Sequence, residues 1–314
     1  MRHFHNILYV SRGVDDETDG LKQALSLARN NKAELKTLLI APELPKAMKA
    51  YEAKYQTSMA DDMRKAVLKT AESIKIPEGD VRFEVVLETD KTPATRIIQH
   101  VLQNDHDLVI KESETRGKKS GLKALDMDLL RKCPCPVWLC RPIEQSRQEI
   151  KVAVAIDPKT EEAVAEALSK RMLELAQSLA EDCSGELHIV SCWDYEFEEY
   201  LRHNPWAKVN ESEIQDALYN TERSHKMALD GLINQAGVKE KSNRTHHIRG
   251  AADEEIPEFV TRNNIDILVM GTVARTGIPG FIIGNTAENI VQKVPCSLMA
   301  LKPKGFVSPV KAYS

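Results

Sequence analysis

The residues best suited to chemistry lie in one stretch of the sequence, Ile265–Lys293. An apolar run typical of a strand, Asp266–Met270, is followed by a loop with four glycines and then by a helix pattern. Glycines between a strand and a helix let backbone N–H groups approach a ligand closely, and the N-terminus of the helix adds partial positive charge. The stretch predicts a cradle for a phosphate or another anion, and a glycine-rich loop without a ligand is the alternative.

The predicted cradle has identifiable parts. Asn285 suits the N-cap of the helix, and Glu288 three residues later completes a pattern like the capping box. Arg275 is the candidate for a charged contact with phosphates, and an exposed loop arginine is the alternative. The candidate binding residues of the strand end, loop and helix start are Met270, Gly271, Thr272, Arg275, Gly277, Gly284, Asn285 and Thr286.

Known motifs for nucleotide chemistry and hydrolysis are absent from the sequence. It contains no G-x-x-x-x-G-K-[ST] phosphate loop, and no G-x-G-x-x-G opens a helix after a strand. A G-x-S-x-G nucleophile elbow is also missing. Because no general base or nucleophile stands out, no catalytic residue is assigned, and we expect a binding protein with at most weak hydrolysis.

Composition limits the classes of partner. The chain has 314 residues, enough for two domains, with 42% hydrophobic and 29% charged residues. Its net charge of −4 disfavours nucleic acid as the main partner, since binding to phosphate backbones favours a basic excess. No apolar run approaches the ~20 residues of a membrane span. The N-terminus resembles no signal peptide, so we expect a cytoplasmic protein.

Cysteines and histidines predict no metal site. Cys133-Pro-Cys135 has one residue between the thiols, where common zinc and redox motifs have two, so buried thiols are expected. His246 and His247 are adjacent on a strand pattern and should face opposite sides of the sheet. His3 and His5 would share a strand face, but two ligands are too few for a closed zinc site.

The order of predicted elements repeats once along the chain. Strand patterns at 6–11, 33–40, 81–87, 107–110 and 136–140 alternate with helix patterns, and a second series begins at 151–156 and ends at 296–301. The string D-L-V-I at 107–110 corresponds to D-I-L-V at 266–269. Such alternation predicts an α/β fold with two tandem, doubly wound, five-stranded parallel sheets of Rossmann-like type.

In open α/β sheets, ligands bind beyond the carboxyl ends of the strands where strand order reverses. This rule should bring the end of 151–156, with Ala155 and Asp157, next to Met270 and Gly271. Asp157 could accept hydrogen bonds from an adenine or a ribose while the glycine loop holds phosphates. Alternatively, Asp157 simply begins a turn in the string D-P-K-T.

These residues resemble the universal stress protein family, whose ATP-binding members carry G-x-x-G, nine residues, then G-[ST], with an aspartate ending strand one. Gly271-Thr272-Val273-Ala274, Arg275–Ile283 and Gly284-Asn285-Thr286 follow that pattern, with Ala274 for the second glycine and Asn285 for the serine or threonine. The resemblance implies a stress-response protein that binds ATP with Mg²⁺. It also implies an internal pseudo-dimer of two domains paired through their fifth strands.

We expect domains at 1–143 and 149–304 and a tail at 305–314. The first domain departs from the pattern, with Ser11-Arg12 where the aspartate should stand and a charged loop, Lys111–Gly117, after strand four. A degenerate site is therefore expected there, or a cavity for another ligand.

The aromatic insertion Trp193–Asn210 either packs on its own domain, overhangs the cleft as a lid or binds a partner.

Three functions remain open from the sequence. The first is a binder of ATP or a related nucleotide in the second domain. The second is an interaction scaffold without nucleotide chemistry, whose candidate partners are other proteins and a second copy of the chain. The third keeps the cradle for another phosphorylated ligand, such as a nucleotide-sugar or a lipid-linked intermediate, with Ile278, Phe281 and Ile282 lining the pocket.

Overall fold

A computed structural model gives the structure of the protein for a defined set of residues. It describes residues 3–11, 13, 18–41, 44–77, 79–80, 82–90, 92–113, 115–116, 119–159, 162–204, 209–239, 243–272 and 283–313. The chain divides into two compact units. Unit 1 comprises Met1–Gln145, Thr272–Gly284 and Cys296–Ser314, and unit 2 comprises Ser146–Gly271 and Asn285–Pro295.

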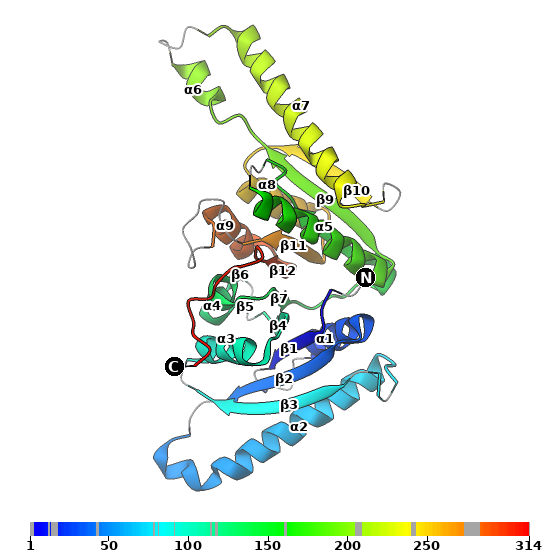
Figure 1. Ribbon diagram of the computed structural model, residues 1–314, viewed down its shortest axis with the longest axis vertical. Helices are drawn as coiled ribbons and strands as arrows, with labels where there is room; N and C mark the ends of the chain where they lie inside the picture. Colours follow the sequence, from blue (N-terminus) through cyan, green and yellow to red (C-terminus); the bar gives the residue numbers. More distant parts are fainter. Residues whose placement is uncertain are drawn as a thin grey trace. The chain divides into compact units, whose positions relative to one another are not determined.

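Unit 1 holds the first series of alternating strands and helices together with the last strand of the chain (Figure 1). Its strands are β1 (Asn6–Ser11), β2 (Glu34–Ala41), β3 (Phe83–Thr89), β4 (Leu108–Glu112), β5 (Thr115–Arg116), β6 (Lys119–Leu122), β7 (Val137–Cys140) and β12 (Ser297–Leu301). Its helices are α1 (Thr18–Asn31), the 3₁₀ helix η1 (Lys46–Tyr51), α2 (Glu52–Ser73), α3 (Pro93–Asn104) and α4 (Ala124–Lys132). The 3₁₀ helix η1 continues directly into α2.

The main sheet of unit 1 has the strand order β12-β7-β4-β1-β2-β3. All pairings are parallel except that of β7 with β12, in which Leu139 pairs with Leu298 and Val137 with Ala300. The fifth strands of the two sequence repeats therefore pair with each other, as the resemblance implied. A separate antiparallel hairpin, β5–β6, begins within the charged loop predicted at Lys111–Gly117 and continues beyond it.

Unit 2 repeats the same architecture with four strands. Its strands are β8 (Lys151–Ala155), β9 (Glu186–Trp193), β10 (Asn243–Arg249) and β11 (Ile267–Gly271). Its helices are the 3₁₀ helix η2 (Arg147–Glu149), α5 (Ala163–Cys183), α6 (Glu198–His203), α7 (Glu211–Gln235), α8 (Ala252–Arg262) and α9 (Asn285–Lys293). The strand order is β10-β9-β8-β11 with parallel pairings.

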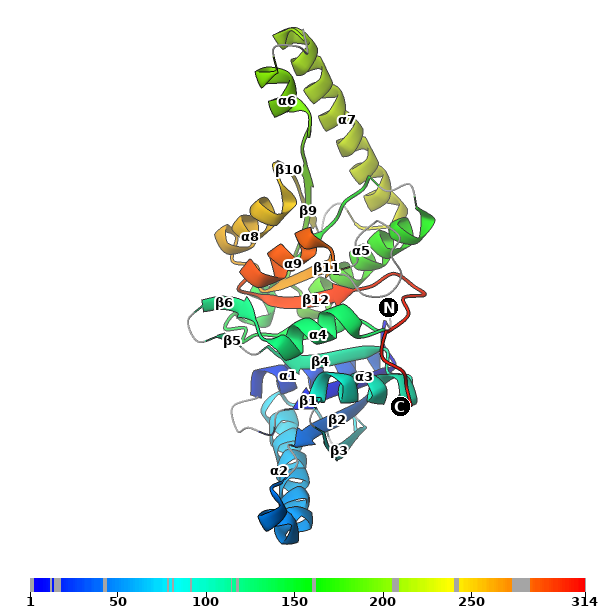
Figure 2. The same ribbon diagram turned by 90° about the vertical axis from the view of Figure 1, so that its left-hand side faces the viewer.

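Helices cover both faces of each sheet. In unit 1, α1 packs on α2 and α3 on α4, while in unit 2, α5 packs on α7 and α8 on α9. Figure 2 shows the two helix pairs of unit 2 on opposite sides of its strands. Strands covered on both faces should be continuous apolar runs, and Val152–Val154 and Leu108–Ile110 are indeed fully buried. The α/β prediction with a mostly parallel sheet is confirmed.

The repeated aspartate before strand four has the same role in both units. In unit 1, the Asp107 carboxylate accepts the backbone N–H groups of His5 and Asn6, at 2.7 and 3.1 Å. In unit 2, Asp266 accepts the N–H of Lys151 at 2.8 Å. Each carboxylate therefore ties the start of strand four to the start of strand one, and satisfies donors that the sheet leaves unpaired there.

A buried ion pair lies at the carboxyl end of β4 in unit 1. The ammonium of Lys111 contacts Asp126 Oδ1 at 2.9 Å, and the two side chains are 1% and 0% exposed. The same ammonium donates to the carbonyl of Glu112 at 3.0 Å. Lys111 comes from the middle of the sheet and Asp126 from α4, so the pair fixes that helix over the strand end.

Removing one partner of this pair should strongly destabilise unit 1. Asp126→Asn leaves the Lys111 ammonium buried without its carboxylate, which typically costs about 3–5 kcal/mol. Asp128→Asn on the same helix is the matched control, because its pair with Lys132 is about one-third exposed, and such pairs contribute about 1 kcal/mol or less. Urea unfolding followed by circular dichroism measures both, and equal shifts of the two midpoints would contradict the expectation.

Candidate functional site

The sequence-predicted site in the second repeat lies at a reversal of strand order. From β8 the chain crosses to β9, whereas β11 lies on the other side of β8. The register pairs Val154 with Val269, so Ala155 and Met270 follow at the same edge of the sheet. Asp157 and Gly271 come at or just beyond the two strand ends. The switch point expected from the sequence is therefore present between β8 and β11.

Gly271 is required by the packing of α5 on the end of β11. A Cβ atom at this position would lie 3.3 Å from Leu168 Cδ2 and 3.7 Å from Met172 Sδ. A side chain here would crowd Leu168, so the missing side chain lets α5 pack closely on the strand end.

Hydrogen bonds fix both ends of the glycine-rich loop. The N–H of Thr272 donates to the carbonyl of Leu301 at 3.1 Å, and Thr272 is buried. The N–H of Gly284 donates to the carbonyl of Thr272 at 3.0 Å, which brings the two ends of the loop together. Arg275, Gly277 and the substituted Ala274 lie between these ends, outside the described residues.

The start of α9 is exposed. Asn285 is the first residue of the helix, one position later than the cap that the sequence suggested for it, and Thr286 follows. Both side chains are exposed. The helix is anchored by Asn289, which donates to the Asp253 carboxylate at 2.9 Å, and by Lys293, which donates to the Asp253 carbonyl at 2.9 Å. This N-terminus carries partial positive charge and N–H groups that have no partner within the helix itself.

Asp157 forms the turn that was the alternative interpretation from the sequence. Its Oδ1 accepts the backbone N–H of Lys159 at 2.9 Å, a turn of the Asx type. The side chain is exposed at the carboxyl edge of the sheet. Forming the turn and facing a ligand are compatible, since a carboxylate has two oxygens with about four acceptor positions.

The first repeat fills the equivalent place with side chains. Aligning the strings at 107 and 266 puts Lys111 and Glu112 where the second repeat has Met270 and Gly271. Here the glycine is on the helix, because a Cβ atom on Gly20 of α1 would lie 3.2 Å from Glu112 Cβ. At this contact between strand and helix, the second repeat has its glycine on the strand, whereas the first repeat has it on the helix. Glu112 and the buried Lys111 therefore take the space that a cradle would need.

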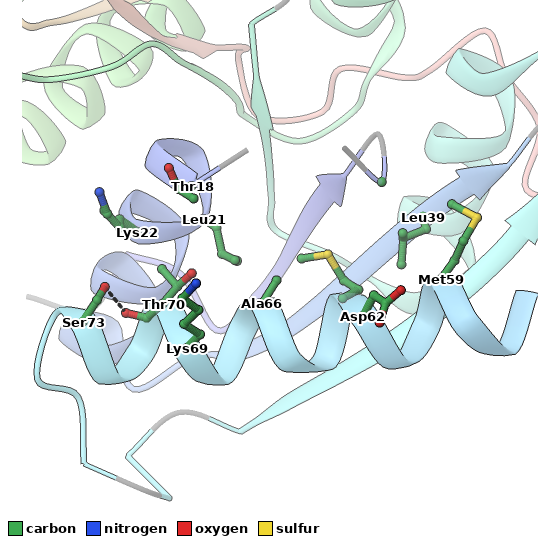
Figure 3. Close-up of a pocket in the computed structure, with 12 residues that line it drawn as sticks. Thr18, Leu21, Lys22, Leu39, Met59, Asp62, Ala66, Lys69, Thr70 and Ser73 are labelled. Carbon is green, nitrogen blue, oxygen red and sulfur yellow. Dashed lines mark hydrogen bonds between the residues drawn. The ribbon is translucent and has the colours of Figure 1, made fainter. Parts of the chain in front are cut away.

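Unit 1 has a cavity in another place, between α1 and α2 above β2. Its volume is about 560 Å³. Figure 3 shows Leu21, Leu39 and Ala66 along its apolar part, with Lys22 and Lys69 toward one end. Gly13 permits the close approach of α2, since its φ is +71° and a Cβ atom there would lie 2.7 Å from Met59 Cε. This space is not at the strand ends where the sequence suggested a cavity for another ligand.

The histidines of unit 2 form two pairs that the sequence did not suggest. His246 and His247 face opposite sides of β10, as predicted, but each meets another histidine. His188 Nδ1 lies 3.1 Å from His246 Nε2, and His225 Nδ1 lies 2.9 Å from His247 Nε2. In unit 1, His3 and His5 precede β1 and do not share a strand face. Among the described residues, no group of three potential ligands could hold a metal ion.

The aromatic insertion packs on its own unit. Trp193 forms a small core with Ile214 and Leu218 of α7, and Tyr195, Leu201 and Val209 pack against it. The insertion also contains α6, whose Phe197 cap and Tyr200 are 60% and 59% exposed. Sequence reasoning left this packing open because two of the three core residues come from α7, outside the insertion. None of the helices in the described part of the chain is long and apolar enough to cross a membrane.

Comparisons with known proteins agree on the family. The model of the universal stress protein family matches residues 3–141 and 151–302. The chain is 28% identical to "Universal stress protein E" of Photorhabdus laumondii, over 99% of each chain. It is 27% identical to the protein of that name in Escherichia coli K12, covering 99% of this chain and 98% of the other.

Solved structures show the same fold. A functionally unknown protein from Pseudomonas aeruginosa PAO1 superimposes with a TM-score of 0.73 at 22% identity, covering 96% of this chain and 94% of the other. A universal stress protein from Archaeoglobus fulgidus DSM 4304 superimposes with a TM-score of 0.59 at 17% identity, covering 96% of this chain and 99% of the other.

The histidine pairs predict a loss of stability in mild acid. Burial, and then the charge of His247, lower the pKa of His225 from 6.5 to about 4. Between these values the unfolded chain binds more protons than the folded one, so stability falls as pH decreases from about 6.5 to about 4. Between pH 7 and pH 5, His225 alone should contribute a loss of about 2 kcal/mol.

Thermal unfolding at pH 7 and pH 5 tests this contribution. His225→Gln should reduce the difference between the two melting temperatures, whatever its effect at either pH alone. His203→Gln is the control, because the His203 side chain is 73% exposed, and it should leave the difference unchanged. An unchanged difference in His225→Gln would contradict the assignment.

Proposed function

Because the chain belongs to the universal stress protein family, we propose that it binds ATP or a related nucleotide in its second half. The observation that carries this proposal is the convergence of three features at one switch point. Asp157 is exposed beyond β8, Gly271 leaves the end of β11 without a side chain, and α9 begins with exposed polar residues. A carboxylate opposite an anion cradle suits a nucleotide.

The proposed roles follow from the chemistry of each group. Asp157 accepts hydrogen bonds from the adenine or ribose, while Ala155 and Met270 contribute the neighbouring strand ends. Phosphates lie against the start of α9, and Gly271, Thr272 and Gly284 contribute the strand end and the loop ends next to it. Asn285 and Thr286 offer an amide and a hydroxyl to the same phosphates. Arg275 and Gly277 belong to the proposed site by sequence pattern.

The proposed activity is binding, with at most weak hydrolysis. Mg²⁺ would accompany ATP by bridging its phosphates, since this ion keeps several waters and needs few protein ligands. We place the protein in the cytoplasm as part of a stress response, with other proteins or a second copy of the chain as candidate partners. The two halves then have different tasks, because Lys111 and Glu112 fill the equivalent place in the first half.

An interaction scaffold without nucleotide chemistry is the second candidate. The observation in its favour is the exposure of large aromatic side chains on α6 and α7 and at the α6 cap. Phe197, Tyr200 and Tyr219 are each about 60% exposed. Single exposed apolar residues are normal, but three aromatic rings on two contacting helices resemble an interaction surface. The departures at Ala274 and Asn285 from the family pattern also favour this function.

Isothermal titration with Mg-ATP tests nucleotide binding. We expect the wild-type protein to bind with a dissociation constant of about 10 μM, corresponding to about −7 kcal/mol. Asp157→Ala removes an acceptor for the nucleoside and should weaken binding about tenfold, the effect of about 1.4 kcal/mol. Gly284→Ala adds a methyl group where the backbone approaches the phosphates and should weaken binding at least as much.

Asp194→Ala is the matched control for the titration. Asp194 is also an exposed carboxylate just after a strand of unit 2, but it follows β9, away from the switch point. This variant should bind Mg-ATP like the wild type. If the wild-type protein gives no heat with millimolar Mg-ATP, the nucleotide proposal fails and the scaffold becomes the better interpretation.

A further inference from the structure

Two cysteines of unit 1 lie side by side at the end of α4. Cys133 Sγ and Cys135 Sγ are 3.6 Å apart, and both residues are buried. Cys133 caps the helix with an extended backbone, φ −66° and ψ 131°. The chain bends at Pro134 and Cys135, and the two side chains meet although one residue separates them.

A buried lysine stands beside the two thiols. Lys302 follows β12, is 5% exposed and donates from Nζ to the Cys133 carbonyl at 2.7 Å. Its ammonium also lies 4.9 Å from the centroid of the Phe306 ring. In the described part of the chain, no carboxylate forms an ion pair with Lys302. A buried positive charge requires a compensating negative one, and the neighbouring thiols are able to provide it as a thiolate.

The surroundings of the two thiols shift their pKa values in opposite directions. Burial alone raises the pKa of Cys133, but the hydrogen bond with Cys135 and the charge of Lys302 outweigh it, so the net pKa is lowered. The pKa of Cys135 is raised well above its usual value, by the same hydrogen bond and by burial. Burial lowers the pKa of Lys302 to about 8 against the opposing effect of the thiols. Cys133, whose carbonyl binds the Lys302 ammonium, is therefore assigned as the nucleophile of the pair, and Cys135 as the second thiol.

We propose that Cys133 and Cys135 form an oxidisable dithiol that hydrogen peroxide, or another small peroxide, converts to an intrachain disulfide. The Cys133 thiolate attacks one peroxide oxygen and breaks the O–O bond, which gives a sulfenic acid and, after protonation of the leaving oxygen, one water. The sulfur of Cys135 then attacks the Cys133 sulfur, forms the S–S bond and displaces the hydroxyl as a second water. Two electrons pass from the sulfurs to the peroxide, and both thiol protons end in water.

The geometry requires only a small movement for this bond. The sulfurs must approach from 3.6 Å to about 2.05 Å, which rotation about the two Cα–Cβ bonds provides in part. The dithiol and its lysine share no residue with the proposed nucleotide site.

The C-terminal tail is bound next to the dithiol. After Lys302 it runs past α4 and α3 (Figures 1 and 2), held by Ser308, whose hydroxyl donates to the Lys132 carbonyl at 2.7 Å. Near its end, the Ala312 carbonyl accepts a hydrogen bond from Gln103 at 2.6 Å. Cys133 is 0% and Cys135 9% exposed. A molecule as small as hydrogen peroxide is therefore the expected oxidant, and bulky disulfides should react slowly.

Peptide mapping of the full-length protein after graded peroxide treatment and alkylation tests the proposal without any mutation. The expected first product is one linkage between Cys133 and Cys135, with loss of two hydrogens. The control thiols are Cys183 and Cys192, which are more exposed but whose pKa values burial raises, that of Cys192 to about 11. If Cys183 or Cys192 is oxidised first, or if Cys133 and Cys135 stay alkylatable, the proposal is overturned.

Two variants then separate the roles. In Cys135→Ser, oxidation should stop at the sulfenic acid of Cys133, which a dimedone-type reagent traps. Lys302→Met removes the positive charge and should slow oxidation about tenfold at neutral pH if the pKa of Cys133 rises by about one unit. Cys192→Ser should react like the wild type. An unchanged rate in a folded Lys302→Met protein, checked by circular dichroism, would contradict the role of the lysine.

Discussion

The pairing of the first and fourth strands in each unit is the constraint on which the rest of the structure depends. β1 pairs with β4 and β8 with β11, and an aspartate before each fourth strand binds the start of the first. The connection after the first strand and the connection after the fourth strand run toward opposite ends of the sheet. No helix can then cover the carboxyl edge between them, and a place for a ligand is created at that edge.

The two halves use this edge differently although their backbones follow the same plan. In the second half, the glycine is on the strand, and Gly271 leaves room for the side chain of Leu168 on the helix. In the first half, the helix has the glycine and the strand has Glu112. Beside it, the Lys111 ammonium is satisfied by a buried carboxylate. Close packing of the strand on the helix requires one of the two contacting residues to be small. Whether the glycine is on the strand or on the helix therefore decides whether a side chain fills the strand end.

Burial of ionisable groups is a second theme of the fold. Lys111, Lys302 and His225 all lie in places where a charge is costly, and each has a polar neighbour. The outcomes differ with the neighbour. A carboxylate keeps Lys111 paired, and a thiol beside Lys302 becomes acidic, whereas burial and a second imidazole keep His225 neutral.

The sequence by itself determined the α/β class, the repeat, and the placing of Asp157 and Gly271 at one edge, because strand and helix periods are local and topology follows from crossover rules. It also indicated that His246 and His247 face apart. Only the tertiary structure decided which residues meet them, and it alone brought Lys302 to Cys133, 169 positions away in the chain. Contacts between distant segments depend on how helices pack on the sheet, and no local pattern of residue types records that packing.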